Sequence, residues 1–504
     1  MDTMQKKSRN HSKLQQNFMA AKQMSLTLLV DKERNKVIYA ESGKDFVEIL
    51  LSFLTLPIGT VIKLSGKQSK MGSLTMLYKS LEELDLEFPN TKACKDMLLH
   101  PKSSAEELYK NLPLIVNRGA TYRTKYYICS LECCVGIHHL VSTVKDAPCL
   151  CGKKMGWRVP EEKGDLNADG EDGVFIEGKM RFMIRDDLKI SVVSSWKSFA
   201  LLKKFGVSDT SVLEEMNVNV GEEEVLHLLK RLLLSKTPLT DVFLGELNVD
   251  ERVDLDLKVI ALDSEEMVEP QTEKEICTEY SKKMIVKLYQ NKLNKKVLYA
   301  EAGEEFADLL FSLLAFPLGS IVKCLGGRTS MGCLDNLYKS VEDLNFKDCM
   351  KYEEFKAMLL DPKLPPYFGT KNQLLQIEEQ APCPMAFSRV MRSIGLSTMN
   401  QKFPDAVTEL GGSFVAGPAL FMVTDELVVK PLSPMLGVSF LSNFNIPVSD
   451  IEEQIVWMGE KEAMSLLGAS LISNSVLTDV FYHKRPRQME TKPNRRMFSA
   501  HDFI

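Results

Sequence analysis

The residues best suited to chemistry in this 504-residue chain are cysteines gathered between positions 126 and 155. The stretch YYICSLECCVGIHHLVSTVKDAPCLCGKKM holds five of them, which are Cys129, Cys133, Cys134, Cys149 and Cys151. They fall into two sets about 15 residues apart, and each set comes at the end of a run typical of a strand. Thiolates brought together by a β-hairpin are the ligands of a structural zinc ribbon, a closed site that contributes folding energy directly.

The spacing of the cysteines leaves the ligand set open. The first pair can be C-x3-C or C-x4-C and the second is C-x-C, whereas zinc ribbons usually carry two C-x2-C pairs. His138 and His139 lie between the two sets and are substitute ligands. Buried, reduced cysteines in a β-rich segment would give the same pattern. The sequence predicts a structural zinc site, and it does not distinguish Cys133 from Cys134 as the ligand.

Composition indicates the compartment and the general class. Eleven cysteines in a chain whose first 23 residues hold no apolar signal-peptide core favour reduced thiols or metal ligands over disulfides. The longest apolar stretches, 46–62 and 306–322, fall short of the roughly 20 residues of a membrane span. The formal net charge of −5 gives no overall attraction to nucleic acid or anionic membranes. We expect a soluble protein of the cytoplasm or nucleus that binds no membrane, and nucleic acid is disfavoured as a partner.

One long segment of the sequence occurs twice. Residues 37–84 align without a gap to 297–344 at a constant offset of 260, and 22 of the 48 positions are identical. The correspondence ends in LTDVF, at 239–243 and again at 477–481. A repeat of about 220 residues is too long for a solenoid unit, so we predict two tandem homologous units. We expect each unit to pack its own interior, with the shared residues serving shape.

The boundaries of the units follow from composition. Residues 246–279 hold twelve acids against three bases, which is typical of a linker. The predicted organisation is a disordered basic N-terminus (1–23), a first repeat unit (24–245), an acidic linker (246–281), a second repeat unit (282–483) and a disordered basic tail (484–504).

Each unit is expected to begin with a β-hairpin, formed in the first unit by 25–31 and 36–41. A helix follows and Pro57 ends it. The apolar run 59–64 is interpreted as a short buried strand, and a second helix is predicted at 73–84.

Toward the end of the unit, residues 179–194 predict a hairpin that turns at Asp186 and Asp187. Helices are expected near 195–205 and after Gly221, where three glutamates would occupy the positive end of the helix dipole. Because strands and helices do not alternate in a regular β-α-β-α rhythm, the predicted fold class is α+β rather than a doubly wound parallel sheet.

The repeated segments resemble a family of plant proteins called domain of unknown function 674. The resemblance is carried by SLTLLVDKERNKVIYAESGKDFVEILLSFLTLPIGTVIK (25–63), MGSLTMLYKSLEEL (71–84) and SKTPLTDVFLG (235–245), and it covers nearly the whole chain apart from the termini and the linker. The family's middle region usually carries a similar CxCG element, which favours the zinc site. The resemblance implies a plant origin and brings no established activity, substrate or catalytic residue.

The predicted zinc site belongs to the first unit alone. In the second unit the corresponding stretch, 370–389, retains only Cys383. If zinc were essential to the fold, the second unit would have to close this region in another way.

No residue pattern typical of catalysis is found in the sequence. The chain has only seven histidines and contains neither a G-x-S-x-G elbow nor an H-E-x-x-H helix. Glu41 and Glu301 are the best remaining carboxylates, and we interpret them as acids stabilised by the dipole of the helix that follows.

The sequence therefore favours a non-enzymatic structural or protein-interaction module with a structural metal site in the first unit and an unknown protein partner. The alternative is an enzyme or small-molecule binder with a cleft between the two units. A third hypothesis is a nucleic-acid-associated zinc module that uses the basic termini.

Overall fold

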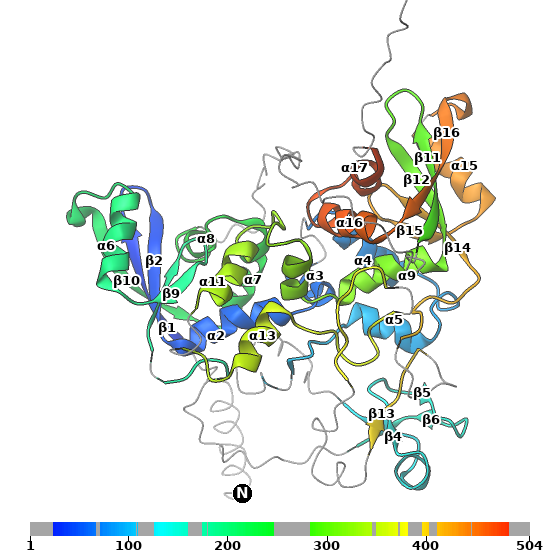
Figure 1. Cartoon of the computed structure of the whole chain (residues 1–504), viewed down its shortest axis with the longest axis horizontal. Coiled ribbons are helices and arrows are strands. Elements are labelled where there is room, and N and C mark those ends of the chain that lie inside the picture. Colours follow the sequence, from blue (N-terminus) through cyan, green and yellow to red (C-terminus); the bar gives the residue numbers. More distant parts are fainter. Residues whose placement is uncertain are drawn as a thin grey trace, which may run out of the picture.

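Both sheets and helices build the computed structural model of the chain (Figure 1), so the fold class is α+β, as predicted. The structure describes residues 24–66, 71–106, 108, 125–159, 174–178, 180–245, 283–344, 349–370, 373–381, 396–402, 411–444 and 446–482. The predicted linker and the two predicted basic ends lie outside these ranges. Among the described helices, none is long and apolar enough to cross a membrane.

The first large sheet is antiparallel and uses strands of the first half of the chain in the order β10-β1-β2-β8-β9. Its strands are β1 (Met24–Asp31), β2 (Lys36–Ser42), β8 (Phe182–Arg185), β9 (Ile190–Val192) and β10 (Leu213–Val220). In β1 the alternate residues Leu26, Leu28 and Val30 are buried, because successive side chains of a strand point to opposite faces.

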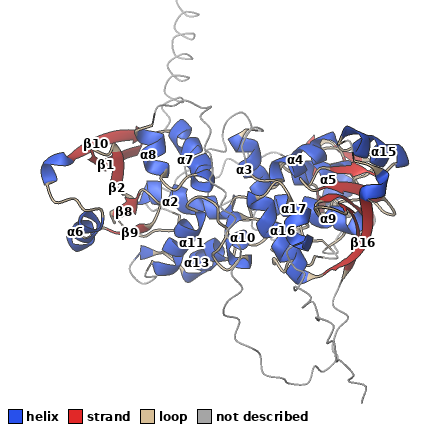
Figure 2. Ribbon diagram, turned by 90° about the horizontal axis from the view of Figure 1, so that it is seen from above, coloured by secondary structure: helices blue, strands red, loops and turns tan. Residues whose placement is uncertain are grey.

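The second large sheet is also antiparallel, and its order is β15-β14-β12-β11-β16. Its strands are β11 (Met284–Asn291), β12 (Val297–Gly303), β14 (Leu420–Thr424), β15 (Val429–Pro431) and β16 (Ile451–Met458). The first hairpins of the two sheets shift register at matched positions, Leu29/Val30 and Tyr289/Gln290. The matched sequence segments thus form sheets with the same pairing pattern at opposite ends of the molecule (Figure 2).

The chain also forms helices, most of which lie between the two large sheets (Figure 2). Those of the first half are α2 (Lys44–Ser52), α3 (Ile58–Ser65), α4 (Leu74–Glu83), α5 (Lys92–Leu99), α6 (Ser195–Lys204), α7 (Glu222–Leu234) and α8 (Pro238–Phe243), with the short 3-10 helices η1 (Phe53–Thr55) and η5 (Thr210–Val212). Those of the second half are α9 (Glu304–Ser312), α10 (Leu318–Cys324), α11 (Leu334–Asp343), α13 (Glu353–Leu360), α15 (Pro434–Asn443), α16 (Glu460–Ile472) and α17 (Val476–Tyr482), with η6 (Leu313–Ala315) and η8 (Val448–Asp450).

Most of the elements expected from the sequence are confirmed, including both hairpins, α2, α4, α6 and α7. The predicted strand at 59–64 is wrong, because this segment is helix α3. Pro57 is the N-cap of α3, so it begins a helix as well as ending the previous one. Val61 and Ile62 are completely buried. A short segment made mostly of apolar residues shows neither the 3.6-residue period of a helix nor the two-residue period of a strand, so its sequence did not distinguish the two.

The two halves exchange helices. Helix α4 of the first half contacts β15 of the second sheet, and α11 of the second half contacts β9 of the first sheet (Figure 1). Helix α5 packs on α4, and α13 packs on α11. The Ser80 hydroxyl on α4 accepts a hydrogen bond from the Val429 N–H on β15 at 3.0 Å. The Ser340 hydroxyl on α11 accepts one from the Ile190 N–H on β9 at 2.9 Å. The expectation that each half packs its own interior is therefore wrong.

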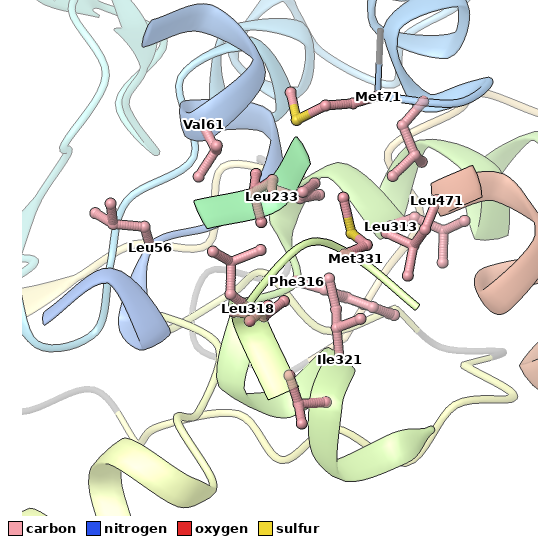
Figure 3. Packing of buried hydrophobic residues seen from close by; sticks show 14 of the residues in the cluster. Leu56, Val61, Met71, Leu233, Leu313, Phe316, Leu318, Ile321, Met331 and Leu471 are labelled. Atoms are coloured by element: carbon pink, nitrogen blue, oxygen red, sulfur yellow. The ribbon is translucent and has the colours of Figure 1, made fainter. Parts of the chain in front are cut away.

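The chain segments cross at two prolines, Pro57 and Pro317, which form an isolated antiparallel bridge. The Ile58 N–H donates to the Phe316 carbonyl at 2.9 Å, and the Leu318 N–H donates to the Leu56 carbonyl at 3.0 Å. Apolar residues of both halves surround this crossing, among them Leu56, Val61, Leu233, Leu313, Phe316, Leu318 and Ile321 (Figure 3). They belong to one buried cluster that reaches from one large sheet to the other.

Two glycines allow the exchanged segments to pack closely. Gly72 lies against α16 of the second half, and a Cβ added there would be 2.5 Å from the Ser470 carbonyl oxygen. Gly332 lies against α7 of the first half, and a Cβ there would be 2.2 Å from the Leu232 carbonyl oxygen. Both glycines have positive φ angles, +48° and +37°, which residues with a Cβ atom rarely adopt.

Replacing Gly332 with alanine should lower the free energy of unfolding by about 3 kcal/mol, because the new methyl group would collide with α7 and the backbone would be strained. Urea unfolding monitored by circular dichroism measures the loss. Gly303→Ala is the matched control, since a Cβ at Gly303 meets nothing within 4 Å. Equal losses in the two variants would contradict the close packing between the halves.

The exchange also predicts how the halves behave when they are separated. Fragments 1–245 and 246–504 each lack one of the helices that cover their sheet, α11 and α4 respectively, so each should be insoluble or self-associated when it is expressed alone. Expressed together with a tag on one fragment, they should co-purify in equal amounts. Two soluble, monomeric fragments that do not bind one another would contradict the exchange.

Candidate metal centre

The predicted zinc ligands lie in a small module, residues 125–159, here called the cysteine module. Its elements are β3 (Tyr127–Ile128), the π-helical turn η4 (Leu131–Val135), β4 (Leu140–Val141), β5 (Ala147–Pro148), β6 (Lys154–Met155) and β7 (Trp157–Arg158). Strand β3 pairs with β7, and β5 pairs with β6. As predicted, the cysteines follow strands, since Cys129 comes directly after β3 and Cys149 directly after β5.

A segment of the second half completes the module. Strand β13 (Ser397–Thr398) lies parallel to β4 (Figure 1), with Ser397 N–H donating to the His139 carbonyl at 2.8 Å. The module has its own buried cluster, which consists of Ile128, Cys129, Cys134, Leu140, Val141, Cys149, Met155, Leu396 and Met399. It is distinct from the cluster between the large sheets.

Four thiols converge in this module. The sulfur atoms of Cys129, Cys133, Cys134 and Cys149 all lie within 4.8 Å of one another. Individual Sγ–Sγ distances are 3.3 Å for Cys129 and Cys134, 3.7 Å for Cys133 and Cys149, and 3.8 Å for Cys134 and Cys149. A tetrahedral zinc ion with Zn–S bonds of about 2.3 Å separates its sulfurs by roughly 3.8 Å. The donor set therefore fits a zinc ion.

Local hydrogen bonds fix the first cysteines. Ser130 is the N-cap of η4, and its hydroxyl accepts a hydrogen bond from the Cys133 N–H at 3.2 Å. The Cys129 N–H donates to the Cys134 sulfur, also at 3.2 Å. Such N–H to sulfur bonds favour the thiolate that a metal requires.

The second cysteine pair lies on a tight turn. The Cys149 N–H donates to the Lys153 carbonyl and the Gly152 N–H to the Cys149 carbonyl, both at 2.8 Å. Gly152 has φ +80°, a value that glycine adopts easily. This turn also brings the sulfur of Cys151 to 3.6 Å from that of Cys129. Cys151 is exposed and lies outside the four-thiol group.

The thiols of the group have very different proton affinities. Burial raises the pKa of Cys149 and of Cys134, and it raises the pKa of Cys133 to about 12. Burial acts in the same direction on Cys129, but hydrogen bonds from Cys134 and the other thiols lower its pKa to about 7. Four neighbouring thiolates would repel one another strongly. A bound divalent cation is the kind of group that would compensate their charge.

The sequence analysis also named His138 and His139 as substitute ligands, and Cys133 and Cys134 as alternatives. Neither His138 nor His139 belongs to the convergent group, which contains both Cys133 and Cys134. The structure therefore places both cysteines in the candidate ligand set. Cys383, the remaining cysteine of the corresponding stretch in the second half, lies outside the described residues.

The interpretation of Glu41 and Glu301 as helix-dipole acids is wrong, because both lie within strands, β2 and β12. The Glu41 carboxylate is 3.6 Å from the guanidinium of Arg181. The Glu301 carboxylate accepts a hydrogen bond from the Tyr289 hydroxyl at 3.2 Å.

Two buried ionisable residues, Lys402 and Asp308, were not predicted. Lys402 is 1% exposed; its ammonium donates to the Gly369 carbonyl and lies 4.4 Å from the centre of the Phe414 ring. Asp308 on α9 is also buried and accepts hydrogen bonds from the N–H groups of Phe414 and Val415, at 2.5 Å and 3.2 Å. Burial raises the pKa of Asp308 to about 6. The one sequence signal was an aspartate inside the otherwise apolar run 306–322.

The buried lysine predicts a pH dependence of stability. Burial lowers the pKa of Lys402 from 10.5 to about 8. Between these values the native state binds fewer protons than the unfolded state, so the contribution of Lys402 to the free energy of unfolding rises with pH. Lys402→Met should remove this rise. Urea unfolding at pH 8 and pH 10.5 measures it, with the exposed Lys339→Met as the control. A variant that keeps the slope of the parent would contradict the prediction.

The fold and the cysteine module define an α+β protein with a four-thiol candidate metal centre. The chain belongs to the family of proteins of unknown function DUF674, whose family model matches residues 20–461. This match confirms the resemblance carried by the repeated segments. No curated protein and no solved structure matches the chain.

Proposed function

We propose that this chain is a non-enzymatic structural and protein-interaction protein whose first half holds a structural zinc ion in the cysteine module. The observation that carries the proposal is the convergence of four thiols, whose sulfur atoms all lie within 4.8 Å of one another, with three of the separations at 3.3 to 3.8 Å. Separations of this size are close to the roughly 3.8 Å that tetrahedral zinc sets between its sulfur ligands. When bound, zinc would supply the positive charge that keeps the thiolates together.

The small core of the cysteine module supports a need for metal. Three of its nine buried residues are the cysteines themselves, which leaves six other side chains to stabilise the module. Small units with so little apolar surface usually depend on disulfides or a metal. All the cysteines of the module are free thiols, so a metal is the remaining means of stabilisation.

The closed form of the thiol group supports a structural role for the metal. Four protein ligands fill the coordination sphere of zinc, whereas a catalytic zinc keeps one position for water or substrate. Cys134 is fully buried, and Cys129 and Cys149 are at most 8% exposed. The metal would hold β3, η4 and the turn after β5 in place, and with them the strand β4 on which β13 lies.

The surface of the module supports a role in protein interaction. Leu131, Ile137 and Trp157 are each at least 70% exposed. Large apolar side chains exposed together on a small unit are typical of protein-binding sites, and aromatic residues are enriched there. The partner is inferred as a protein and not identified further.

We infer further that the two halves arose by duplication of one unit. The 22 identities in 48 aligned positions and the shared strand-pairing pattern support this inference. In this account the second unit keeps the fold and has lost the cysteines.

Metal analysis of the purified full-length chain tests the zinc proposal. The parent should contain one zinc ion per chain by inductively coupled plasma mass spectrometry. Cys134→Ser combined with Cys149→Ser should lose it, because two of the four ligands are removed. Cys324→Ser on α10, outside the thiol group, should keep it.

Amide hydrogen exchange adds a structural measurement to the same variants. Loss of zinc should accelerate exchange at Ser397 and Met399, whose N–H groups bond to the module, and leave the pairing of β11 with β12 protected. A parent chain without zinc, or unchanged metal in the double variant, would contradict the proposal.

A further inference from the structure

The outer face of the second sheet carries an exposed apolar patch. It consists of Ile285, Ile455 and Trp457, which are 55%, 58% and 59% exposed. Ile285 on β11 is directly opposite Trp457 on β16, and Ile455 is two residues away on the same face of β16. We call these three residues the edge patch.

Helix α15 covers another part of this face. The Phe440 ring of α15 packs edge-on against Tyr299 with ring centres 5.7 Å apart, and Tyr299 stacks on Tyr289 at 4.8 Å. The buried cluster under α15 is built on Leu298, Tyr299 and Met422 and includes none of the edge patch. The edge patch thus lies outside the part of the face that α15 covers.

The edge patch lies on an open strand edge. Strand β16 is the last strand of its sheet, and among the described residues it pairs with β11 alone. The Lys292 N–H donates to the Asp450 carbonyl at 2.8 Å, so even-numbered residues of this strand direct their backbone groups to β11. Glu453, Ile455 and Trp457 therefore direct theirs to the open edge.

Of the usual devices that prevent edge pairing, the strand carries charged side chains alone, Glu452 and Glu453. Its sequence, IEEQIVWM, contains no lysine or proline, the two residues that most often block an open edge. It is eight residues long, which is enough for several inter-strand hydrogen bonds.

The first sheet provides a comparison within the same chain. Its edge strand β10 occupies the position of β16, but Asn217 and Asn219 stand where β16 has Ile455 and Trp457, and Ser25 lies opposite Asn219. Asn217 also accepts a hydrogen bond from the Thr27 hydroxyl at 2.9 Å. Since this fold forms with polar residues at the same positions, the edge patch is not required for folding.

We propose that β16 pairs with β16 of a second copy of this chain, antiparallel and centred on Ile455, so that two five-stranded sheets become one ten-stranded sheet. In this register Ile455 faces Ile455 of the second copy, and Trp457 faces Glu453. Apolar side chains meet at the centre, and no two glutamates are directly opposed. Because Ile455 directs its backbone to the open edge, the central pair exchanges two hydrogen bonds.

A second copy is a suitable partner because, in a two-fold symmetric dimer, β16 of each copy forms one side of the interface. The same residues then provide the unpaired N–H and C=O groups and the apolar cover on each side. The inference deepens the proposed role in protein interaction by naming a partner, and it does not depend on zinc, since the edge patch and the cysteine module share no residue.

Sedimentation of the full-length chain over a range of concentrations tests the pairing. The parent should be a dimer. Ile455→Lys combined with Trp457→Lys should weaken the dimer at least tenfold, because the lysines would repel across the two-fold axis. Asn217→Lys combined with Asn219→Lys places the same charges on β10 and should leave the dimer unchanged. Both double variants change exposed side chains, and circular dichroism checks that each variant is otherwise intact.

Amide exchange separates edge pairing from other contacts. In the parent, the amides of Glu453, Ile455 and Trp457 should be protected, and in the lysine variant of β16 they should exchange rapidly. A monomeric parent overturns the proposal, as does a β16 variant that dimerises like the parent or a dimer in which these amides are unprotected. A monomer with protected amides would show that a segment of the same chain covers the edge, and this too overturns it.

Discussion

The constraint on which the rest of the structure depends is the crossing of the two halves at Pro57 and Pro317. Two backbone hydrogen bonds join the segments there, between Ile58 and Phe316 and between Leu318 and Leu56. Beyond this point each segment continues into the opposite lobe, so each large sheet is covered by helices of both halves. Since the buried cluster is continuous between the sheets, we expect the chain to unfold as one cooperative unit.

The crossing leaves the outer surfaces of the two halves free to differ. The first half carries the cysteine module, and the second half carries the edge patch on β16. The second half also contributes β13 to the cysteine module, so the candidate metal centre belongs to the assembled chain. The two surfaces support the proposal that the halves of one scaffold present different binding surfaces.

Local sequence patterns predicted much of the fold, and contacts between distant segments were not predictable. The hairpins and helices α2 and α4 followed from periodicity and turn residues. The helix exchange could not be predicted in this way. The local sequences around Ser80 and Ser340 are similar and do not indicate whether each serine bonds to its own half or to the other half. The cysteines were found from their spacing. Lys402 was missed because its partners, Gly369 and Phe414, are brought together only by the tertiary fold.

Zero-length crosslinking with a carbodiimide tests the central claim, the exchange of helices, most directly. Lys189, beside β9, and Asp343 on α11 form an ion pair between the halves at 3.4 Å, and Lys295 and Glu452 form one within the second half at 2.6 Å. On a single chain isolated by gel, mass spectrometry should find both crosslinked peptides. The Lys295 to Glu452 crosslink without the Lys189 to Asp343 crosslink would contradict the exchange.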